Sequence, residues 1–257
     1  MKIFYFTGTG NSLSIAKQMG GKLFSIPLML AKGELSHEDD AIGLVFPCYY
    51  FNIPAIVNEF VSRASLSANY FFAVMTYGNT SGLGLEKLKK TAKLAGIGFH
   101  YTNEILMTDN FLPAFDIKKQ IALEGKKEIE KNTATILNDI KYRKVNSVKK
   151  KGILTRIVAT VVSKTLSLNG QEDKNFRVDK SCISCGTCLK VCPRSNIISV
   201  DGKPTYRHKC EYCLSCIHAC PITAIHIKGE KNSARFRNKN VSLEEIINSN
   251  SVIELKN

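Results

Sequence analysis

Residues 182–193 read CISCGTCLKVCP, and residues 210–221 repeat the pattern as CEYCLSCIHACP. The second copy begins 28 residues after the first, and both have the spacing C-x2-C-x2-C-x3-C-P. Of the nine cysteines in the chain, only Cys48 lies outside these two runs. Thiols gathered so closely are typical of metal ligands rather than of disulfides in a reducing compartment. The two runs therefore predict metal chemistry in the last third of the sequence.

Both runs resemble the motif of bacterial-type ferredoxins, in which the fourth cysteine of each run ligates the cluster of the other run. The resemblance implies two [4Fe-4S] clusters in this chain. Each ligand set then joins three cysteines of one run to the last cysteine of the other, namely Cys182, Cys185, Cys188 and Cys220 in the first set and Cys210, Cys213, Cys216 and Cys192 in the second. Paired zinc sites are the alternative, because C-x2-C units also occur in zinc ribbons, but the third and fourth cysteines favour the clusters.

The segments around the cysteine runs indicate short strands. Residues 175–178, 197–200 and 225–227 are rich in apolar and β-branched side chains, and Asp201-Gly202 predicts a turn after the second segment. Strands of this length around two cysteine runs predict a small α+β ferredoxin domain over residues 173–229.

Residues 2–19, KIFYFTGTGNSLSIAKQM, are the other informative stretch. An apolar strand runs directly into a glycine loop that opens a helix, and the free amides and hydroxyls of such a loop can bind a phosphate. The loop lacks the G-K-[ST] of a nucleotide P-loop, and Leu13 occupies the position of the third glycine of a dinucleotide fingerprint. An FMN phosphate loop and an ordinary glycine turn remain as interpretations.

This loop resembles the FMN phosphate loop of the flavodoxin family, although Ser12 and Met19 depart from the usual residues of that family. The resemblance implies an α/β fold with a doubly wound parallel flavodoxin-like sheet over residues 1–145, and FMN beyond the carboxyl ends of its strands. Strand-like residues 41–46 and 70–78 are followed by loops that would flank the flavin ring. The implied FMN contacts form a phosphate loop and two walls: Thr7, Gly8, Thr9, Gly10, Asn11 and Ser12; Pro47, Tyr49, Tyr50 and Asn52; and Thr76, Tyr77, Gly78 and Asn79.

Cys48 lies in the first of these two loops, and we interpret it as a small packed side chain rather than a redox group. Together the two halves resemble the fused flavodoxin-like and ferredoxin proteins of anaerobic bacteria.

The middle of the chain carries most of its excess positive charge. The net charge is +14, and residues 118–171 contain 13 Lys and Arg against 4 Asp and Glu. Apolar spacing predicts one long helix over residues 117–142. Residues 146–172 are expected to connect the domains, and their apolar part, 152–168, predicts a helix. We favour a helix buried between the domains, with contact of residues 143–168 to an acidic membrane surface as the alternative.

The last segment, residues 230–257, predicts a C-terminal tail with a short helix. Ser242 and Glu245 have the spacing of a capping box at the start of that helix.

We expect an electron-transfer protein that moves electrons between two [4Fe-4S] clusters and FMN. An FMN-dependent reductase of a quinone or another small acceptor is the alternative, and a membrane-surface adaptor and an iron-sulfur sensor are further hypotheses. No catalytic residue is predicted, and whether the chain is an enzyme stays open. Because positive charge would remain after the cofactors bind, the expected partner is an acidic redox protein.

Other partners and locations follow from what the sequence lacks. No nucleic-acid motif is present, so nucleic acid is not an expected partner. The sequence shows neither a long apolar run nor a signal-peptide pattern, which predicts a cytoplasmic protein. The electron donor and acceptor, the potentials and the oligomeric state are not predicted.

Overall fold

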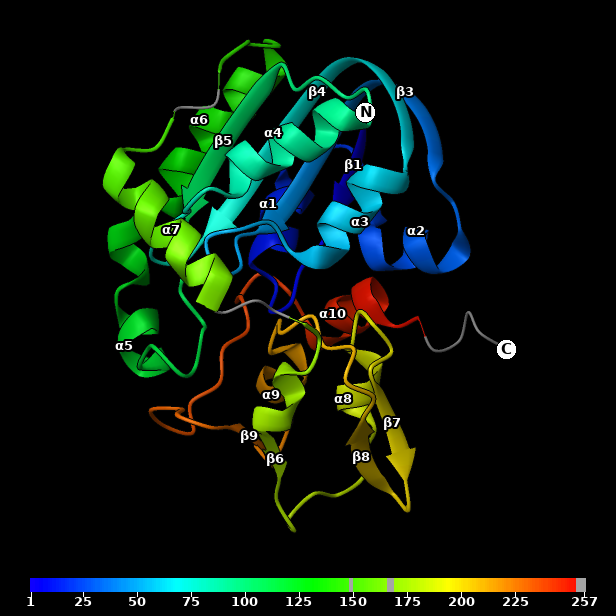
Figure 1. The fold of residues 1–257 in the computed structure, drawn as a ribbon, viewed down its shortest axis with the longest axis vertical. Helices are drawn as coiled ribbons and strands as arrows, with labels where there is room; N and C mark the ends of the chain where they lie inside the picture. The colour runs from blue at the N-terminus through cyan, green and yellow to red at the C-terminus, as the bar shows by residue number, and fades with distance from the viewer. Residues whose placement is uncertain (148–149, 166–168, 253–257) are drawn as a thin grey trace.

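A computed structural model describes residues 1–147, 150–165 and 169–252 of the chain. It has a large α/β part and a smaller cysteine-rich part at one end of the sheet (Figure 1). The sheet of the larger part is fully parallel, with strand order β2-β1-β3-β4-β5. The strands are β1 (Lys2–Tyr5), β2 (Lys22–Ser25), β3 (Ser36–Pro47), β4 (Ser65–Tyr77) and β5 (Tyr101–Leu106). This is the strand order of the flavodoxin-like doubly wound fold, so the predicted fold is confirmed.

Helices cover both faces of this sheet. Apolar side chains of α2 (Ile26–Lys32), α3 (Ala55–Arg63) and α4 (Gly84–Leu94) pack on one face. On the other face lie α1 (Asn11–Gln18) and α6 (Ile129–Lys141). The core of this second face continues without interruption into the cysteine-rich part, because both belong to one cluster of buried side chains. The chain therefore buries its two parts against each other on the α1 side.

The single helix predicted over residues 117–142 is wrong. The segment forms α5 (Ile117–Ala122), a 3-10 turn (Glu124–Lys127) and α6. Glu128 adopts a left-handed conformation with φ 48°, and Gly125 lies in the turn before it. Glycine weakens a helix and a left-handed residue ends one, so the apolar spacing continues across a backbone break that it does not reveal.

The helix α7 (Ile153–Thr165) lies beside β5 and α4, and its packing corrects a second prediction. It is attached by ion pairs from Lys151 to Glu104 of β5 and from Arg156 to Glu86 of α4. Within residues 153–162, the part of the helix whose burial is described, the small Ala159 is buried, whereas the larger apolar side chains of Ile153, Leu154, Ile157, Val158 and Val161 are exposed. The interpretation as a helix buried between domains is therefore wrong for the described residues. Residues 148–149 and 166–168 of this predicted segment lie outside them.

The cysteine-rich part contains two small antiparallel pairs of strands. After a 3-10 turn (Glu172–Asn175), β6 (Phe176–Val178) pairs with β9 (Ile225–Ile227), and β7 (Ile197–Val200) pairs with β8 (Lys203–Tyr206). The short helices α8 (Thr187–Lys190) and α9 (Ser215–His218) lie within the runs, and each contains the third cysteine of its run. The predicted strands and the turn at Asp201-Gly202 are confirmed, and so is the small α+β domain. The prediction missed β8, which contains Pro204.

The tail returns to the larger part of the molecule. It ends in α10 (Leu243–Asn250), which lies between the sheet and the cysteine-rich part in Figure 1. The predicted capping box is present, because the Ser242 hydroxyl accepts from the Glu245 amide and the Glu245 carboxylate accepts from the Ser242 amide. None of the described helices has the length and apolar character needed to cross a membrane.

Candidate cofactor sites

A cavity of about 400 Å³ lies beyond the carboxyl ends of β1, β3, β4 and β5. This volume is in the range of pockets that hold cofactor-sized ligands, about 300 to 1,000 Å³. Twelve of the fourteen predicted FMN contacts line the cavity, and the two that do not are Gly10 and Asn52. The structure therefore brings together most of the residues that the resemblance selected, although they come from three separate loops.

The predicted phosphate loop turns directly into α1. The Thr7 hydroxyl accepts a hydrogen bond from the Gly10 amide at 3.0 Å, and Gly10 has a φ of 100°, which favours glycine. A Cβ on Gly8 would lie 2.8 Å from the Tyr49 hydroxyl and 2.9 Å from the Cys213 carbonyl oxygen. The loop thus needs glycine at both positions, and it has free amides where a phosphate can bind.

Gly10 and Asn52 have structural roles at the edge of the cavity. A Cβ on Gly10 would lie 3.0 Å from Cβ atoms of Asn238 and Val241, so this glycine lets the tail approach the loop. Asn52 pairs with Tyr49 through two backbone hydrogen bonds, and the residues between them, Tyr50 and Phe51, both have positive φ. A tight turn with non-glycine residues in this conformation is strained, and such strain is common at binding sites.

The loop after β5 contributes a wall that the sequence analysis missed. It supplies Thr108, Asp109, Asn110 and Phe111 to the cavity. Burial raises the pKa of the Asp109 carboxyl, which accepts a hydrogen bond from the Phe111 amide. The rule that parallel strands end at one edge could have identified this loop, because β5 is adjacent to β4.

The second cysteine run forms another part of the cavity wall. Tyr212, Cys213 and Leu214 line the cavity, and the Tyr212 ring stacks on Tyr50 with ring centroids 5.3 Å apart and planes 5° from parallel. The edge of the Phe111 ring meets both tyrosines. The cavity is therefore closed by residues from both parts of the chain.

Cys48 lines the cavity as well, and its thiol donates a hydrogen bond to the Ser81 carbonyl oxygen at 3.3 Å. Burial raises the pKa of the Cys48 thiol to about 12, so it stays neutral near pH 7.

The first cysteine set surrounds one small hollow near the surface. All four of its members line this hollow, including Cys220, the cysteine taken from the other run. The Ala224 amide donates to the Cys220 sulfur at 3.2 Å, and Cys185 is exposed to solvent. The fold thus places the last cysteine of the second run beside the first three cysteines of the first run, as the predicted ligand set requires.

The second cysteine set lies deeper. Burial is the main cause of the raised pKa of the Cys216 thiol, and the nearby thiols of Cys213, Cys210 and Cys192, together with Cys188 of the first set, raise it further. The Tyr212 amide donates to the Cys210 sulfur at 3.2 Å, and the Asn196 amide donates to the Cys192 sulfur at 3.3 Å. Hydrogen bonds from backbone amides to the ligating sulfurs tune the reduction potentials of iron-sulfur clusters.

Both predicted donor sets consist of thiols alone, which are the ligands that [4Fe-4S] clusters take. Within the described residues, no three Cys, His, Asp or Glu side chains converge closely enough to hold one metal ion. A cluster spaces its thiolates more widely, because iron atoms lie between them. Burial raises the pKa of the Cys188 thiol to about 12, and the pKa of Cys216 well above its usual value. Buried thiolates therefore need positive charge beside them, which cluster iron would supply.

Backbone conformation confirms the internal repeat beyond the cysteines. Left-handed residues recur 28 positions apart, as Ser184 and Tyr212, Gly186 and Leu214, and Ser195 and Thr223. Because both members of each of these three pairs have the same left-handed conformation, the two runs fold as copies of one unit.

Buried polar contacts fix the second run to the flavodoxin-like part. The Glu211 carboxylate accepts from the Ile56 amide of α3 at 2.9 Å and from Arg194 at 2.7 Å. Arg194 also pairs with Glu59 of α3 at 2.5 Å. The arrangement holds Tyr212 and Cys213 against the cavity.

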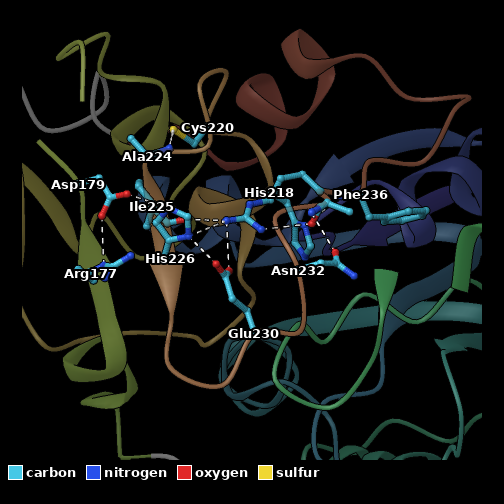
Figure 2. A network of polar contacts seen from close by, with 12 residues as sticks. Arg177, Asp179, His218, Cys220, Ala224, Ile225, His226, Glu230, Asn232 and Phe236 are labelled. Carbon is cyan, nitrogen blue, oxygen red and sulfur yellow. Dashed lines mark hydrogen bonds and ion pairs between the residues drawn. The ribbon is translucent and has the colours of Figure 1, made fainter. Parts of the chain in front are cut away.

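A second set of contacts joins the run to the tail, as Figure 2 shows. His218 is in hydrogen-bond contact with the Asn110 carbonyl oxygen at 2.8 Å through Nε2, and its Nδ1 accepts from the Phe236 amide at 3.1 Å. Burial lowers the pKa of His218 to about 4, so the ring is neutral and its Nε2 carries the proton. Next to it, Arg235 donates to the Ile225 carbonyl oxygen and pairs with Glu230, which also contacts His226.

Comparisons with known proteins support the ferredoxin prediction for the cysteine-rich part. Residues 174–221 match the family described as 4Fe-4S dicluster domain. A segment of 67 residues is 39% identical to an uncharacterised ferredoxin of Methanocaldococcus jannaschii, covering 24% of this chain and 86% of that protein.

Two solved structures are similar to this chain at low scores. A putative flavoprotein from Bacteroides uniformis is 13% identical with a TM-score of 0.32, covering 47% of this chain and 94% of that one. One from Bacteroides eggerthii is 18% identical with a TM-score of 0.31, covering 50% and 97%. The flavodoxin-like assignment rests instead on the strand order of the sheet. The chain belongs to the ferredoxin family through its 4Fe-4S dicluster domain, which is fused here to a flavodoxin-like domain.

Proposed function

We propose that this protein moves electrons between two [4Fe-4S] clusters and one FMN. The observation that carries the proposal is that the second cysteine run forms part of the cavity wall, through Tyr212, Cys213 and Leu214. When bound, the clusters supply one-electron steps and the flavin supplies one-electron or two-electron steps. A chain that holds both cofactors side by side can connect a one-electron carrier to a two-electron acceptor.

The residues around the cavity can be assigned roles toward FMN. The amides at the start of α1 and the hydroxyls of Thr7, Thr9 and Ser12 would hold the phosphate. The Ser12 hydroxyl is already fixed by the Thr76 hydroxyl at 2.8 Å. The loops after β3 and β4 would hold the ring, with the neutral Cys48 thiol as a packing contact.

The packing between the two parts keeps the second cysteine set close to this site. The Cys213 carbonyl oxygen lies against Gly8 of the phosphate loop, where a side chain would clash. Ile217 and Leu214 are buried in the core that both parts share. Because Cys213 itself lines the cavity, the proposed path between the cofactors is short.

The first test is anaerobic purification of the full chain, with iron, sulfide, zinc and flavin measured per chain. We expect about eight irons, about eight sulfides and one FMN. Zinc in place of iron, or iron without any flavin bound after incubation with FMN, would overturn the proposal.

A pair of cysteine variants then tests how the cofactors are arranged. Cys185→Ser and Cys213→Ser occupy equivalent positions 28 residues apart. We expect each to lose or alter one cluster, seen in the iron content and the EPR spectrum. Only Cys213→Ser should also weaken FMN binding, because only Cys213 lines the cavity. The FMN dissociation constant is measured by flavin fluorescence, and equal affinities in the two variants would contradict the arrangement.

A further inference from the structure

The two cysteine runs are copies of one backbone unit, so each surface feature of one has an equivalent in the other. The surface around the second cysteine set is covered by the flavodoxin-like domain and the tail. It consists of Glu211, which binds α3, Tyr212, which stacks on Tyr50, His218, which contacts Asn110, and Arg194, which pairs with Glu59. This half of the ferredoxin domain therefore already has a docked partner, which is its own flavodoxin-like domain.

The equivalent surface around the first set faces solvent. The residues 28 positions away from the four just named are, in the same order, Ile183, Ser184, Lys190 and Ile222. All four are exposed. Ile183 is 61% and Ile222 40% exposed, which is unusual for isoleucine. Both line the hollow formed by the first cysteine set, beside the exposed Cys185. We call this surface the first-set face.

One lysine of the first-set face and two lysines close to it in the sequence are exposed. Lys180, Lys190 and Lys203 are exposed and form no ion pair with any residue in 1–147, 150–165 or 169–252. Of the nearby carboxylates, Asp179 pairs with Arg177, and Asp201 lies in the turn after β7. An exposed apolar centre with unpaired lysines in and beside the same run is complementary to an acidic protein surface with an apolar centre of its own.

We propose that the first-set face docks an acidic one-electron carrier of the ferredoxin class. This inference rests on the proposed function. One electron is exchanged in each encounter between the carrier and the first cluster site, so one protein is oxidised as the other is reduced. No bond forms or breaks and no proton is needed. The two halves of the ferredoxin domain then have different partners, one within the chain and one outside it.

The test uses the full chain loaded anaerobically and a purified acidic bacterial 2[4Fe-4S] ferredoxin as the probe. Binding is measured by surface plasmon resonance, and electron exchange by stopped-flow absorbance, each at low and at high salt. The variant is Lys180→Glu/Lys190→Glu/Lys203→Glu. The control is Lys89→Glu/Lys93→Glu/Lys126→Glu, which changes the net charge equally with exposed lysines of the flavodoxin-like domain.

We expect the variant to lower the affinity and the bimolecular rate at low salt by about tenfold or more, and the control by less than about threefold. High salt should weaken wild-type binding as well. Equal effects of the variant and the control, or salt-insensitive binding, would overturn the inference.

A second variant tests the apolar centre of the face independently of charge. Ile183→Ser/Ile222→Ser should weaken probe binding severalfold at high salt, where the lysines are screened. Unchanged binding would remove the apolar centre from the docking surface and overturn the proposal in this form.

Iron and flavin contents are measured for every protein in these experiments. If the wild type carries no clusters, the proposed function itself fails. If all the proteins carry clusters and FMN and only the docking results differ from expectation, the proposed function stands and this inference alone fails.

Discussion

The two cysteine runs have the same backbone and opposite surroundings. In the second run, position 211 is a buried glutamate that binds α3, and position 218 is a buried histidine that contacts the loop after β5. In the first run, the equivalent positions are Ile183 and Lys190, and both are exposed. The cysteines, the following prolines and the left-handed residues determine how each run folds. The residues between the cysteines determine which run packs against the flavodoxin-like domain.

The largest expected effect comes from removing the buried carboxylate of the second run. Glu211→Ala removes one of the two carboxylate partners that Arg194 has among the described residues, leaving Glu59, and it removes the acceptor of the Ile56 amide. We expect a loss of about 3 kcal/mol in the free energy of unfolding, since the Ile56 amide loses its buried acceptor and Arg194 loses the more buried of its two carboxylate partners. Anaerobic urea denaturation measures it.

An exposed ion pair at the edge of the same domain is the control. Arg177→Ala removes a pair whose arginine is 72% exposed, so we expect a loss below about 1 kcal/mol. Similar losses in the two variants would mean that the second run is not held by its buried contacts.

His218 makes the second run sensitive to acid. Burial lowers its pKa from 6.5 to about 4, so the folded protein binds a proton less readily than the unfolded chain does. The stabilising contribution is complete above pH 6.5 and is lost as the pH falls from 6.5 toward 4, by about 3 kcal/mol in total. Unfolding measured between pH 7 and pH 4 should show this slope, and His218→Gln should reduce it.

The equivalent position in the first run provides a matched control. Lys190→His places a histidine at an exposed site, where we expect no comparable slope. If Lys190→His produced the same acid dependence, or if His218→Gln left it unchanged, burial at the second run would not be its cause.

The smallest of these effects tests the stacked tyrosine. Tyr212→Ser gives the second run the residue that the first run has at this position. We expect the FMN dissociation constant to rise about tenfold, because one aromatic wall of the cavity is lost. Ser184→Tyr is the reciprocal change and should leave FMN affinity unaltered. Flavin fluorescence titrations measure both, and equal affinities across the three proteins would exclude a role for Tyr212 in the flavin site.

Sequence reasoning could predict features whose cause is local. The cysteine spacing predicts the repeat, and the strand ends predict the cavity loops at Pro47 and Thr76. It could not show which run meets the cavity, because that depends on long-range contacts such as Glu211 with Ile56. It also missed the break at Glu128 and the outward face of α7, since apolar spacing does not indicate which side of a helix finds a partner.

The tail has a consequence for how the protein is made. The phosphate loop is completed by residues late in the chain: the Asn238 amide donates to the Thr9 carbonyl oxygen, and the Asn250 side chain donates to that of Thr7. Chains emerge from the ribosome in order, and early segments begin to fold before later ones exist. The loop therefore lacks its last hydrogen-bond partners until both cysteine runs have been synthesised. We expect the nascent flavodoxin-like sheet to take up its flavin only after the ferredoxin domain has been translated.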